Sequence, residues 1–301
     1  MRILLIGANG QVGYCLHRSL VATGEVIATT RDGLLAGGMP CHRLGLDAVE
    51  DIVPSIHRLA PDVVINAAAY TAVDKAETEP DAAYRINAEA VASLARGCAD
   101  TGALLVHYST DYVFSGEAER PWREEDPTAP LGVYGASKLA GEEAVAASGC
   151  AHLILRTAWV YGARGTNFLS TMLRLGAERS ELRVVADQRG TPTPAAWIAQ
   201  ATAAILMRRN EQSGIYHLVA SGETSWHGFS EEIFRGARSA GLIAASPRVA
   251  PITTADFPTP ARRPAYSTLD CSKLERDFGV RLPPWEAGLS QILADLAARK
   301  G

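Results

Sequence analysis

The chain has 301 residues, of which 47% are hydrophobic, and its 29 basic and 33 acidic residues give a formal net charge of −4. This length fits one large or two modest domains and is ample for a packed core. The charges are spread along the chain, without the basic stripe that nucleic acid or an anionic membrane would require. We therefore predict a small soluble ligand as the partner, and neither nucleic acid nor a membrane.

The cysteines, histidines and apolar segments bear on the compartment and on metals. The five cysteines include no C-x-x-C pair, so neither a zinc site nor a disulfide framework is expected. The apolar run Ile3 to Ile6 is too short for a signal peptide, and no later segment approaches the length of a membrane span. The seven histidines are dispersed without metal-ligand spacing. We predict a cytoplasmic protein without a catalytic metal.

A glycine-rich turn follows the first predicted strand, Arg2 to Ile6, and precedes an amphipathic stretch toward Leu20. Strand, glycine turn and helix in this order favour a diphosphate, because glycine lets the backbone approach closely and the helix N-terminus attracts an anion. The spacing is G-x-x-G-x-x-G rather than the usual G-x-G-x-x-G, and glycines also mark ordinary turns. The cofactor contacts predicted in this turn are Gly7, Asn9, Gly10, Gln11 and Val12.

The next strand, Val26 to Thr30, bears on the choice of cofactor. An NAD-selective site usually has an acidic residue here against the ribose 2′-hydroxyl, whereas this chain has Arg31. Arg31 suits the 2′-phosphate of NADP, although a solvated loop arginine explains it nearly as well. We predict NADPH, with NADH as the alternative. Asp47 is predicted either to accept from the adenine amino group or to cap a helix that starts near Val49.

Two further strands are expected to end at the same crevice. The strand DVVIN continues into Ala67, Ala68 and Ala69, whose small side chains allow a cofactor to pass closely. The strand ALLVHYST ends at Thr110, whose hydroxyl suits a substrate carbonyl or, alternatively, the nearby backbone. The crevice therefore has candidate cofactor and substrate contacts side by side.

Strands and helices alternate through residue 161, which predicts a doubly wound parallel sheet with right-handed crossovers. Residues 81–98 are predicted as one amphipathic helix, with Tyr84, Val91, Leu94, Ala95 and Cys98 on its core face. The Pro-rich segment from Pro247 to Pro264 is predicted as a surface loop. Beyond residue 161 we also expect helices at 167–178, 195–207, 229–240 and from 285, and a strand at 182–186.

The stretch LGVYGASKLAGE places Tyr134 and Lys138 four residues apart, on one face of a helix. A nearby ammonium favours an ionised phenol, so we expect Lys138 to lower the pKa of Tyr134 toward neutrality, where the phenol can exchange a proton. For the pair alone, two neighbours on a solvated helix face are the simpler explanation. Other motifs in the chain are needed to distinguish a catalytic pair from two solvated neighbours.

Five motifs together are more specific than any one of them: GANGQVG, NAAAYTAVDKAE, HYSTDYVFSG, VYGASKLAGE and RTAWVYG. In combination they resemble the extended short-chain dehydrogenases, and within that group the dTDP-4-dehydrorhamnose reductase family. The likeness runs from Met1 to about Thr193 and resumes at ARRPAYSTLDCSKL. It implies an α/β Rossmann fold with a smaller substrate lobe. The implied divisions are 1–161 and 183–220 for the dinucleotide-binding domain, and 162–182 and 221–301 for the lobe.

The resemblance implies an NADPH-dependent reduction of the C4 keto group of a nucleotide sugar, a step in deoxysugar biosynthesis. Tyr134 would supply the proton, Lys138 would hold the nicotinamide ribose, and Thr110 would orient the carbonyl. From the residues alone, Trp159 is as readily a core indole. The adjacent Arg262 and Arg263 are equally explained as two solvated charges. The substrate contacts implied by the resemblance are Val73, Tyr112, Trp159 and Arg263.

Some related activities are set aside by what this chain lacks, whereas a reductase or epimerase of another nucleotide sugar stays an alternative. Dehydratases of this group carry Asp-Glu after the catalytic Thr, and reductases that also epimerise carry Cys there, whereas this chain has Asp111 followed by Tyr112. A non-catalytic NADP-binding regulatory subunit is the alternative of a different class, because fold alone does not fix function. Some family members dimerise through magnesium held by glutamates. This chain has Cys15 at one ligand position and no carboxylate near Ala196, so no interface metal is expected and a homodimer stays an open question.

Overall fold

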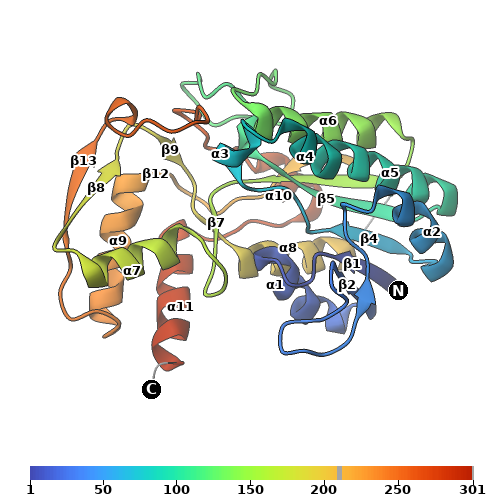
Figure 1. Cartoon of the computed structure of the whole chain (residues 1–301), viewed down its shortest axis with the longest axis horizontal. Coiled ribbons are helices and arrows are strands. Elements are labelled where there is room, and N and C mark those ends of the chain that lie inside the picture. The colour runs from blue at the N-terminus through green and yellow to red at the C-terminus, as the bar shows by residue number, and fades with distance from the viewer. Residues whose placement is uncertain (209–211, 300–301) are drawn as a thin grey trace.

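The larger of two units in this fold is built on a seven-stranded sheet with the order β11-β6-β5-β4-β1-β2-β3 (Figure 1). The structure, a computed structural model, describes residues 1–208 and 212–299. Every neighbouring pair in the sheet is parallel, so the predicted doubly wound parallel sheet is confirmed. Its strands are β1 (Arg2–Ile6), β2 (Glu25–Thr30), β3 (His42–Arg43), β4 (Val63–Asn66), β5 (Leu104–Thr110), β6 (His152–Thr157) and β11 (Gly214–His217).

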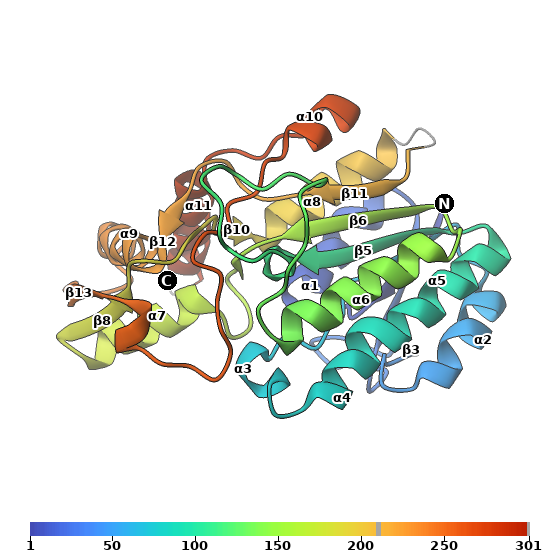
Figure 2. The same cartoon turned by 90° about the horizontal axis from the view of Figure 1, so that it is seen from above.

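Helices cover both faces of this sheet, as Figure 2 shows from above. Leu5 of β1 packs in a buried cluster with Leu16 and Ile198, whereas the adjacent Leu4 packs with Ile56 and Leu94. Successive strand residues point to opposite faces, so an apolar strand needs a helical layer on each side. One layer holds α1 (Gln11–Ser19), α8 (Ala195–Met207) and α10 (Ser272–Phe278); the other holds α2 (Val49–Leu59), α4 (Pro80–Tyr84), α5 (Ala90–Thr101) and α6 (Val133–Ala147).

The stretch predicted as one helix over residues 81–98 is interrupted. A π-helical turn, η2 (Arg85–Glu89), separates α4 from α5. A π turn takes more residues than an α turn, so it shifts the register of the side chains that precede it. The assignment of Tyr84 to the core face is therefore wrong, because this side chain is 37% exposed, whereas Val91 and Leu94 are buried as predicted.

The smaller unit lies at the left of Figure 1, where three helices and a two-stranded parallel sheet share one buried cluster. Its buried cluster includes Leu169, Val184, Phe229 and Leu289. The dinucleotide-binding domain was predicted to resume at residue 183, which lies within β8. Because β8 pairs with β13 rather than with the large sheet, we infer that the chain returns to the larger unit only with α8. The elements of the smaller unit are α7 (Phe168–Glu178), β8 (Glu181–Val185), α9 (Trp226–Ser239), β13 (Arg248–Ile252) and α11 (Trp285–Ala298).

The Pro-rich segment is not a loop throughout, because β13 occupies residues 248–252 of it. Pro251 is tolerated because a two-stranded sheet has only edge strands, where an N–H group is not required on both sides. The remaining short elements are η1 (Leu20–Ala22), α3 (Val73–Ala76), η3 (Asp111–Val113), β7 (Val160–Tyr161), β9 (Arg189–Gly190), β10 (Thr193–Pro194), β12 (Thr224–Ser225) and η4 (Thr254–Asp256).

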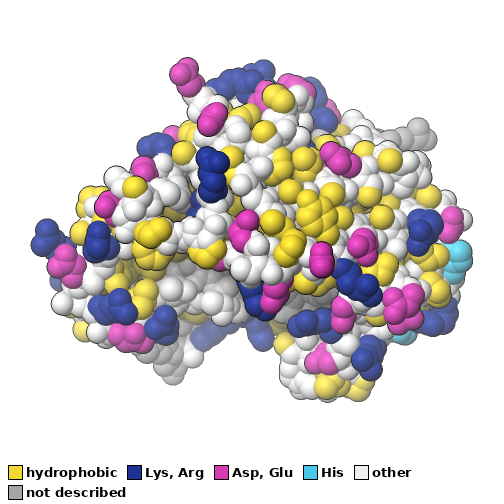
Figure 3. Space-filling model, turned by 45° about the horizontal axis from the view of Figure 1, so that its top comes forward, with side chains coloured by type: hydrophobic (Ala, Val, Ile, Leu, Met, Phe, Trp, Pro, Cys, Tyr) yellow, Lys and Arg dark blue, Asp and Glu magenta, His cyan; other side chains and the backbone are white. Residues whose placement is uncertain are grey.

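The surface in Figure 3 carries basic and acidic side chains interspersed with apolar ones. Such a mixed surface does not concentrate charge of one sign on this face. Within the described residues, no helix combines the length and the apolar character needed to cross a bilayer.

Candidate active site

The glycine turn joins β1 to α1 and depends on its glycines for steric reasons. Gly7 has a left-handed φ of 80°, and a Cβ on Gly13 would lie 2.0 Å from the Gly7 carbonyl oxygen. Gly10 is the N-cap of α1 and supplies no side-chain acceptor for the first N–H groups of that helix. Those donors are therefore available to an anion such as a diphosphate.

The polar side chains of the turn hold neighbouring segments. Asn9 donates to the carbonyl of Leu34 at 2.8 Å and accepts from Ala36 N at 2.8 Å, so it fixes the loop after β2. Gln11 accepts a hydrogen bond from Asn167. Each of these residues therefore has a structural role beside its predicted cofactor contact.

Small residues at the end of β4 lie against this turn. A Cβ on Gly7 would lie 2.8 Å from Cβ of Ala68, and one on Gly10 would lie 3.6 Å from the Ala67 carbonyl oxygen. Larger side chains at 67 to 69 would compete for the space above the turn. The contact of Ala67, Ala68 and Ala69 with a cofactor stays a prediction.

The exposed edge beyond β2 contains a second arginine that the sequence analysis missed. Arg43 Nε donates to the carbonyl oxygen of Arg31 at 3.1 Å, and both side chains are exposed. Asp32 is nearby but accepts from Thr30 Oγ1 at 2.9 Å, and this bond is the main cause that lowers its pKa. No local motif marks Arg43, because only the pairing of β2 with β3 brings it there.

Asp47 lies in the segment before α2. The N-cap of α2 is Ala48 and makes no side-chain cap, so the alternative in which Asp47 caps this helix is not observed. The Asp47 carboxylate is exposed, and its backbone carbonyl accepts two hydrogen bonds from Arg85. The adenine contact stays a prediction.

Thr110 and Tyr134 meet at the carboxyl end of β5. Thr110 Oγ1 donates to Asp111 Oδ1 at 3.0 Å and accepts from Tyr112 N at 3.2 Å. Burial raises the pKa of Tyr134 to about 12, opposed by a hydrogen bond with Thr110 and reinforced by the charge of Asp111. The sheet and α6 thus bring a hydroxyl, a carboxyl and a phenol together.

Lys138 shares a face of α6 with Tyr134 as predicted, but its amine points elsewhere. Nζ donates to the carbonyl oxygen of Tyr108 at 2.7 Å and lies 3.2 Å from Nε2 of His107. The expectation that Lys138 lowers the pKa of Tyr134 is therefore wrong for this structure. Burial instead lowers the pKa of Lys138 to about 8, with Glu142 acting in the opposite direction.

Tight packing fixes α6 where these side chains need it. A Cβ on Gly135 would lie 2.2 Å from the Tyr112 carbonyl oxygen, so only glycine allows the helix to approach η3 this closely. The backbone N–H of Val133 donates to Glu77 Oε1 at 2.8 Å, which places a carboxylate at the N-terminus of the helix. Glu77 belongs to the motif NAAAYTAVDKAE, and its positioning role was not predicted.

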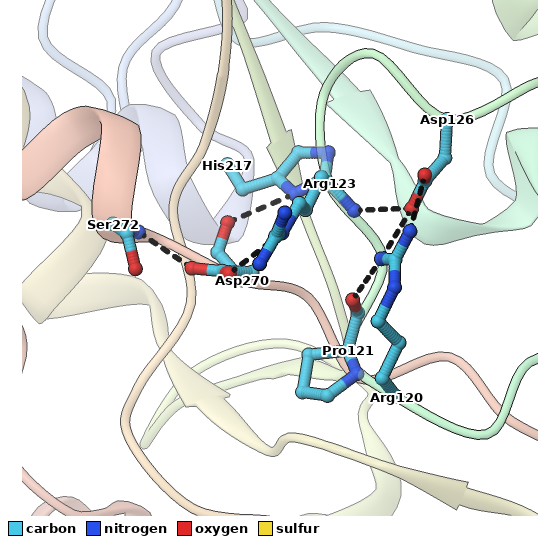
Figure 4. A network of polar contacts seen from close by, with 7 residues as sticks. All are labelled: Arg120, Pro121, Arg123, Asp126, His217, Asp270 and Ser272. Carbon is cyan, nitrogen blue, oxygen red and sulfur yellow. Dashed lines mark hydrogen bonds and ion pairs between the residues drawn. The ribbon is translucent and has the colours of Figure 1, made fainter.

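The loop that connects η3 to α6 is fastened by the polar network of Figure 4. Asp126 accepts from both terminal nitrogens of Arg120 at 2.8 Å and from the backbone of Arg123. Arg123 in turn forms an ion pair with the Asp270 carboxylate at 3.4 Å. The backbone carbonyl oxygen of Asp270 contacts Nδ1 of His217 on β11. The segment between Tyr112 and Tyr134 is thereby tied to β11, the edge strand two places from β5.

Arg263, predicted to bind a diphosphate, forms an ion pair. Its Nη2 donates to Asp74 Oδ2 at 2.8 Å, and Asp74 Oδ1 accepts from Ala261 N at 3.2 Å. Asp74 directly follows Val73 at the start of α3, so the pair brings the Pro-rich segment to the predicted substrate side. Asp74 was missed because nothing local to residue 74 indicates a partner 189 positions away.

Trp159 bridges the two units. Its indole stacks on Trp226 of α9 with ring centroids 3.5 Å apart, and its φ of 45° is left-handed. Gly190 leaves room for the ring, because a Cβ there would lie 2.6 Å from it. The side chain is half-buried rather than a core indole, and Trp226 covers one of its faces. Nearby, Tyr112 packs edge-on to Tyr134 with centroids 5.5 Å apart.

Comparison with known proteins places this geometry in a family. The family model for the RmlD substrate binding domain matches residues 1–298. A curated dTDP-4-dehydrorhamnose reductase from Burkholderia thailandensis is 47% identical, covering 99% of this chain and 100% of its own. The chain belongs to the dTDP-4-dehydrorhamnose reductase family.

Solved structures of this family have the same fold. A dTDP-4-dehydrorhamnose reductase from Clostridium acetobutylicum superimposes with a TM-score of 0.89 at 39% identity, covering 98% of this chain and 99% of its own. The reductase from Bacillus anthracis, solved in complex with NADP, has a TM-score of 0.88 at 34% identity, with the same shares covered. The Rossmann-type fold class is thus confirmed, and the likeness to these reductases covers both units along nearly the whole chain.

The side chains that could bind a metal do not cluster within the described residues. Residues 1–208 and 212–299 contain no group of three or more His, Cys, Asp and Glu side chains arranged to hold an ion. Cys15, on which the prediction of no interface metal partly rests, is half-buried, and burial raises its pKa. The absence of an interface metal stays a prediction.

Proposed function

We propose that this protein reduces the C4 keto group of dTDP-4-dehydrorhamnose with NADPH to give dTDP-L-rhamnose. The observation that carries the proposal is the meeting of Thr110 and Tyr134 at the carboxyl end of β5. The glycine turn follows the carboxyl end of β1 in the same parallel sheet, so both features lie at one edge, where such sheets bind ligands. The family membership supplies the substrate class.

The residues at this edge fit a dinucleotide. The open first turn of α1 after Gly10 suits the diphosphate, and the small side chains after β4 leave room beside it. Arg31 and Arg43 place two guanidinium groups near the end of β2, which favours a 2′-phosphate and hence NADPH over NADH. When bound, NADPH supplies the hydride for the carbonyl carbon.

The protonation state of Tyr134 suits a reduction. Because burial holds the pKa of the phenol near 12, its oxygen carries a proton at neutral pH. Tyr134 Oη can donate that proton as negative charge develops on the substrate oxygen, and Thr110 Oγ1 can hydrogen-bond the same oxygen. Lys138 would hold the nicotinamide ribose.

The substrate would lie between the two units. Tyr112, Val73 and Trp159 offer aromatic and apolar contacts for the sugar and the base. Arg263 is held by Asp74 in a fixed orientation, which lowers the entropic cost of presenting its guanidinium to a diphosphate. The nucleotide sugar is thus the partner that these side chains fit.

The test follows the absorbance of the reduced nicotinamide with dTDP-4-dehydrorhamnose and a panel of other nucleotide keto sugars. We expect turnover with the first substrate and a loss of about 10²–10⁴ in kcat for Tyr134→Phe, because the proton donor is removed. Tyr112→Phe is the matched control, since it removes a neighbouring hydroxyl and should cost far less. A protein that binds NADPH but oxidises none of it with any sugar would instead favour a non-catalytic regulatory subunit.

A further inference from the structure

The amine of Lys138 is buried beside a histidine that the proposed mechanism does not use. Lys138 is 2% exposed and His107 is 1% exposed, and Nζ lies 3.2 Å from Nε2 of the imidazole. The other imidazole nitrogen, Nδ1, lies 3.1 Å from Nδ2 of Asn66. A continuous chain of three buried polar side chains therefore ends at the amine.

The register of the sheet creates this chain. Asn66 on β4 and His107 on β5 are direct partners in the parallel pairing. Side chains at paired positions of neighbouring parallel strands project from the same face, so the amide and the imidazole lie side by side. Lys138 reaches them from α6, which covers that face.

The orientation of the Asn66 amide determines where the proton of His107 lies. The backbone N–H of Ala68 donates to Asn66 Oδ1 at 3.1 Å, so the oxygen faces the backbone and the NH₂ group faces His107. An amide nitrogen can only donate, so Nδ1 of His107 must accept. A neutral imidazole carries one proton, which is then on Nε2 and points at Lys138.

An Nε2–H group can bond to Nζ only if the amine offers its lone pair. Lys138 can do so as a neutral amine while still donating to the Tyr108 carbonyl oxygen at 2.7 Å. An ammonium would instead confront the Nε2–H group or force the proton to Nδ1, opposite the Asn66 NH₂ group. Either arrangement leaves buried donors facing each other, which is unfavourable.

We propose that His107, oriented by Asn66, is a positioning residue that holds Lys138 at the floor of the crevice and favours its neutral form while the cofactor site is free. In this role His107 acts through Lys138, to which its Nε2 is adjacent. The inference rests on the proposed function only where activity is measured. The proton on Nε2 is a property of the folded protein by itself.

Few ionisable side chains of the described residues lie near Lys138. His107 faces it from β5, Glu142 lies one turn along α6, and Arg156 on β6 binds Glu142 through two nitrogens. Tyr134 lies one turn earlier on α6. Burial lowers the pKa of His107 well below its usual value, with the charge of Lys138 acting in the same direction, so the imidazole is neutral. Burial lowers the pKa of Lys138 to about 8, so above this pH the amine is mainly neutral and can accept from the Nε2–H group.

The decisive measurement is nitrogen NMR on the wild-type protein at about pH 9, above the pKa of Lys138, without cofactor. We expect Nδ1 of His107 to resonate as an unprotonated nitrogen and Nε2 as a protonated one, with the signals assigned by their loss in His107→Gln. This readout requires no turnover, so it stands or falls separately from the proposed reductase activity. A proton on Nδ1 would overturn the proposal.

Asn66→Asp tests the causal step. The carboxylate keeps an acceptor for Ala68 N but accepts from Nδ1 as well, so the proton should move to Nδ1 and free Nε2 to accept from an ammonium. We expect the alkaline limb of the kcat/KM profile to move up by about one pH unit. Asn87→Asp is the control, because Asn87 is also buried and bonds Ser137 of α6 but not His107. An unchanged tautomer in Asn66→Asp, or the same change in Asn87→Asp, would contradict the proposal.

Discussion

The side-chain nitrogen of Asn167 donates to Oε1 of Gln11 at 3.0 Å, and this bond joins the smaller unit to the glycine turn. The same nitrogen donates to the carbonyl oxygen of Gly162 at 2.9 Å. Asn167 Oδ1 meanwhile accepts from Ser170 N as the N-cap of α7. One amide therefore sets both the start of α7 and the position of Gln11.

Asn167→Ala should lower stability and weaken NADPH binding together. Loss of the cap costs about 1–2 kcal/mol of unfolding free energy, and loss of the bond to Gln11 loosens the turn. Ser170→Ala is the matched control, because it removes the reciprocal cap bond and keeps the link to Gln11. Urea unfolding and NADPH titration measure the two effects. Equal NADPH affinity in both variants would show that the link does not matter for the cofactor.

The ion pair of Glu142 and Arg156 should be far more costly to break than an exposed pair. Its side chains are 3% and 2% exposed, and the closest contact is 2.6 Å. Arg156→Met leaves a buried carboxylate without its partner, at a cost of about 3–5 kcal/mol. Arg174→Met breaks the exposed pair with Glu178 and should cost about 0.5 kcal/mol or less. Similar midpoints of urea unfolding for the two variants would refute this ranking.

Features that depend on local sequence were predictable. The helix α8 begins and ends at residues 195 and 207, as its pattern predicts, and the glycine turn follows β1 as expected. The core face of α5 was also correct for Val91 and Leu94, because amphipathic periodicity reports burial directly.

What failed depends on contacts between distant segments. Tyr84 was misassigned because a π turn is not marked in the hydrophobic pattern. The direction of Lys138 is set by a carbonyl on β5 and by His107, neither of which four-residue spacing can reveal. Arg43 and Asp74 reach their places only through pairing across the fold. The types of the site residues were therefore easier to predict than their partners.

Arg31→Ala should weaken NADPH binding selectively. A guanidinium bond to a phosphate contributes on the order of 1.5 kcal/mol at an exposed site, so KM for NADPH should rise about tenfold while KM for NADH stays nearly constant. Arg43→Ala should have a smaller effect in the same direction, because its Nε is already bonded to the Arg31 carbonyl oxygen. Arg174→Ala, on the smaller unit, is the control. An equal rise for both cofactors would place Arg31 away from the 2′-phosphate.

Asp111 should make the protein less stable as the pH rises from about 4 to about 6. Burial raises the pKa of this carboxyl to about 6 from its ordinary value of 3.8, with hydrogen bonds from Ser267 and Thr110 in opposition. Between these values the unfolded chain has released the proton and the folded chain retains it, so the unfolding free energy falls with pH. The loss totals about 2–3 kcal/mol and persists above pH 6.

Asp111→Asn removes this titration and keeps the shape of the side chain. The unfolding free energy of the variant minus that of the wild type should therefore rise by about 2–3 kcal/mol between pH 4 and pH 6 and then level off. Burial also lowers the pKa of His217 to about 3, which destabilises the protein in acid, but that term is common to both proteins and cancels in the difference. Urea unfolding at half-unit pH steps measures the curve. A difference that stays flat over this range would mean that Asp111 is ionised in the folded protein at pH 4.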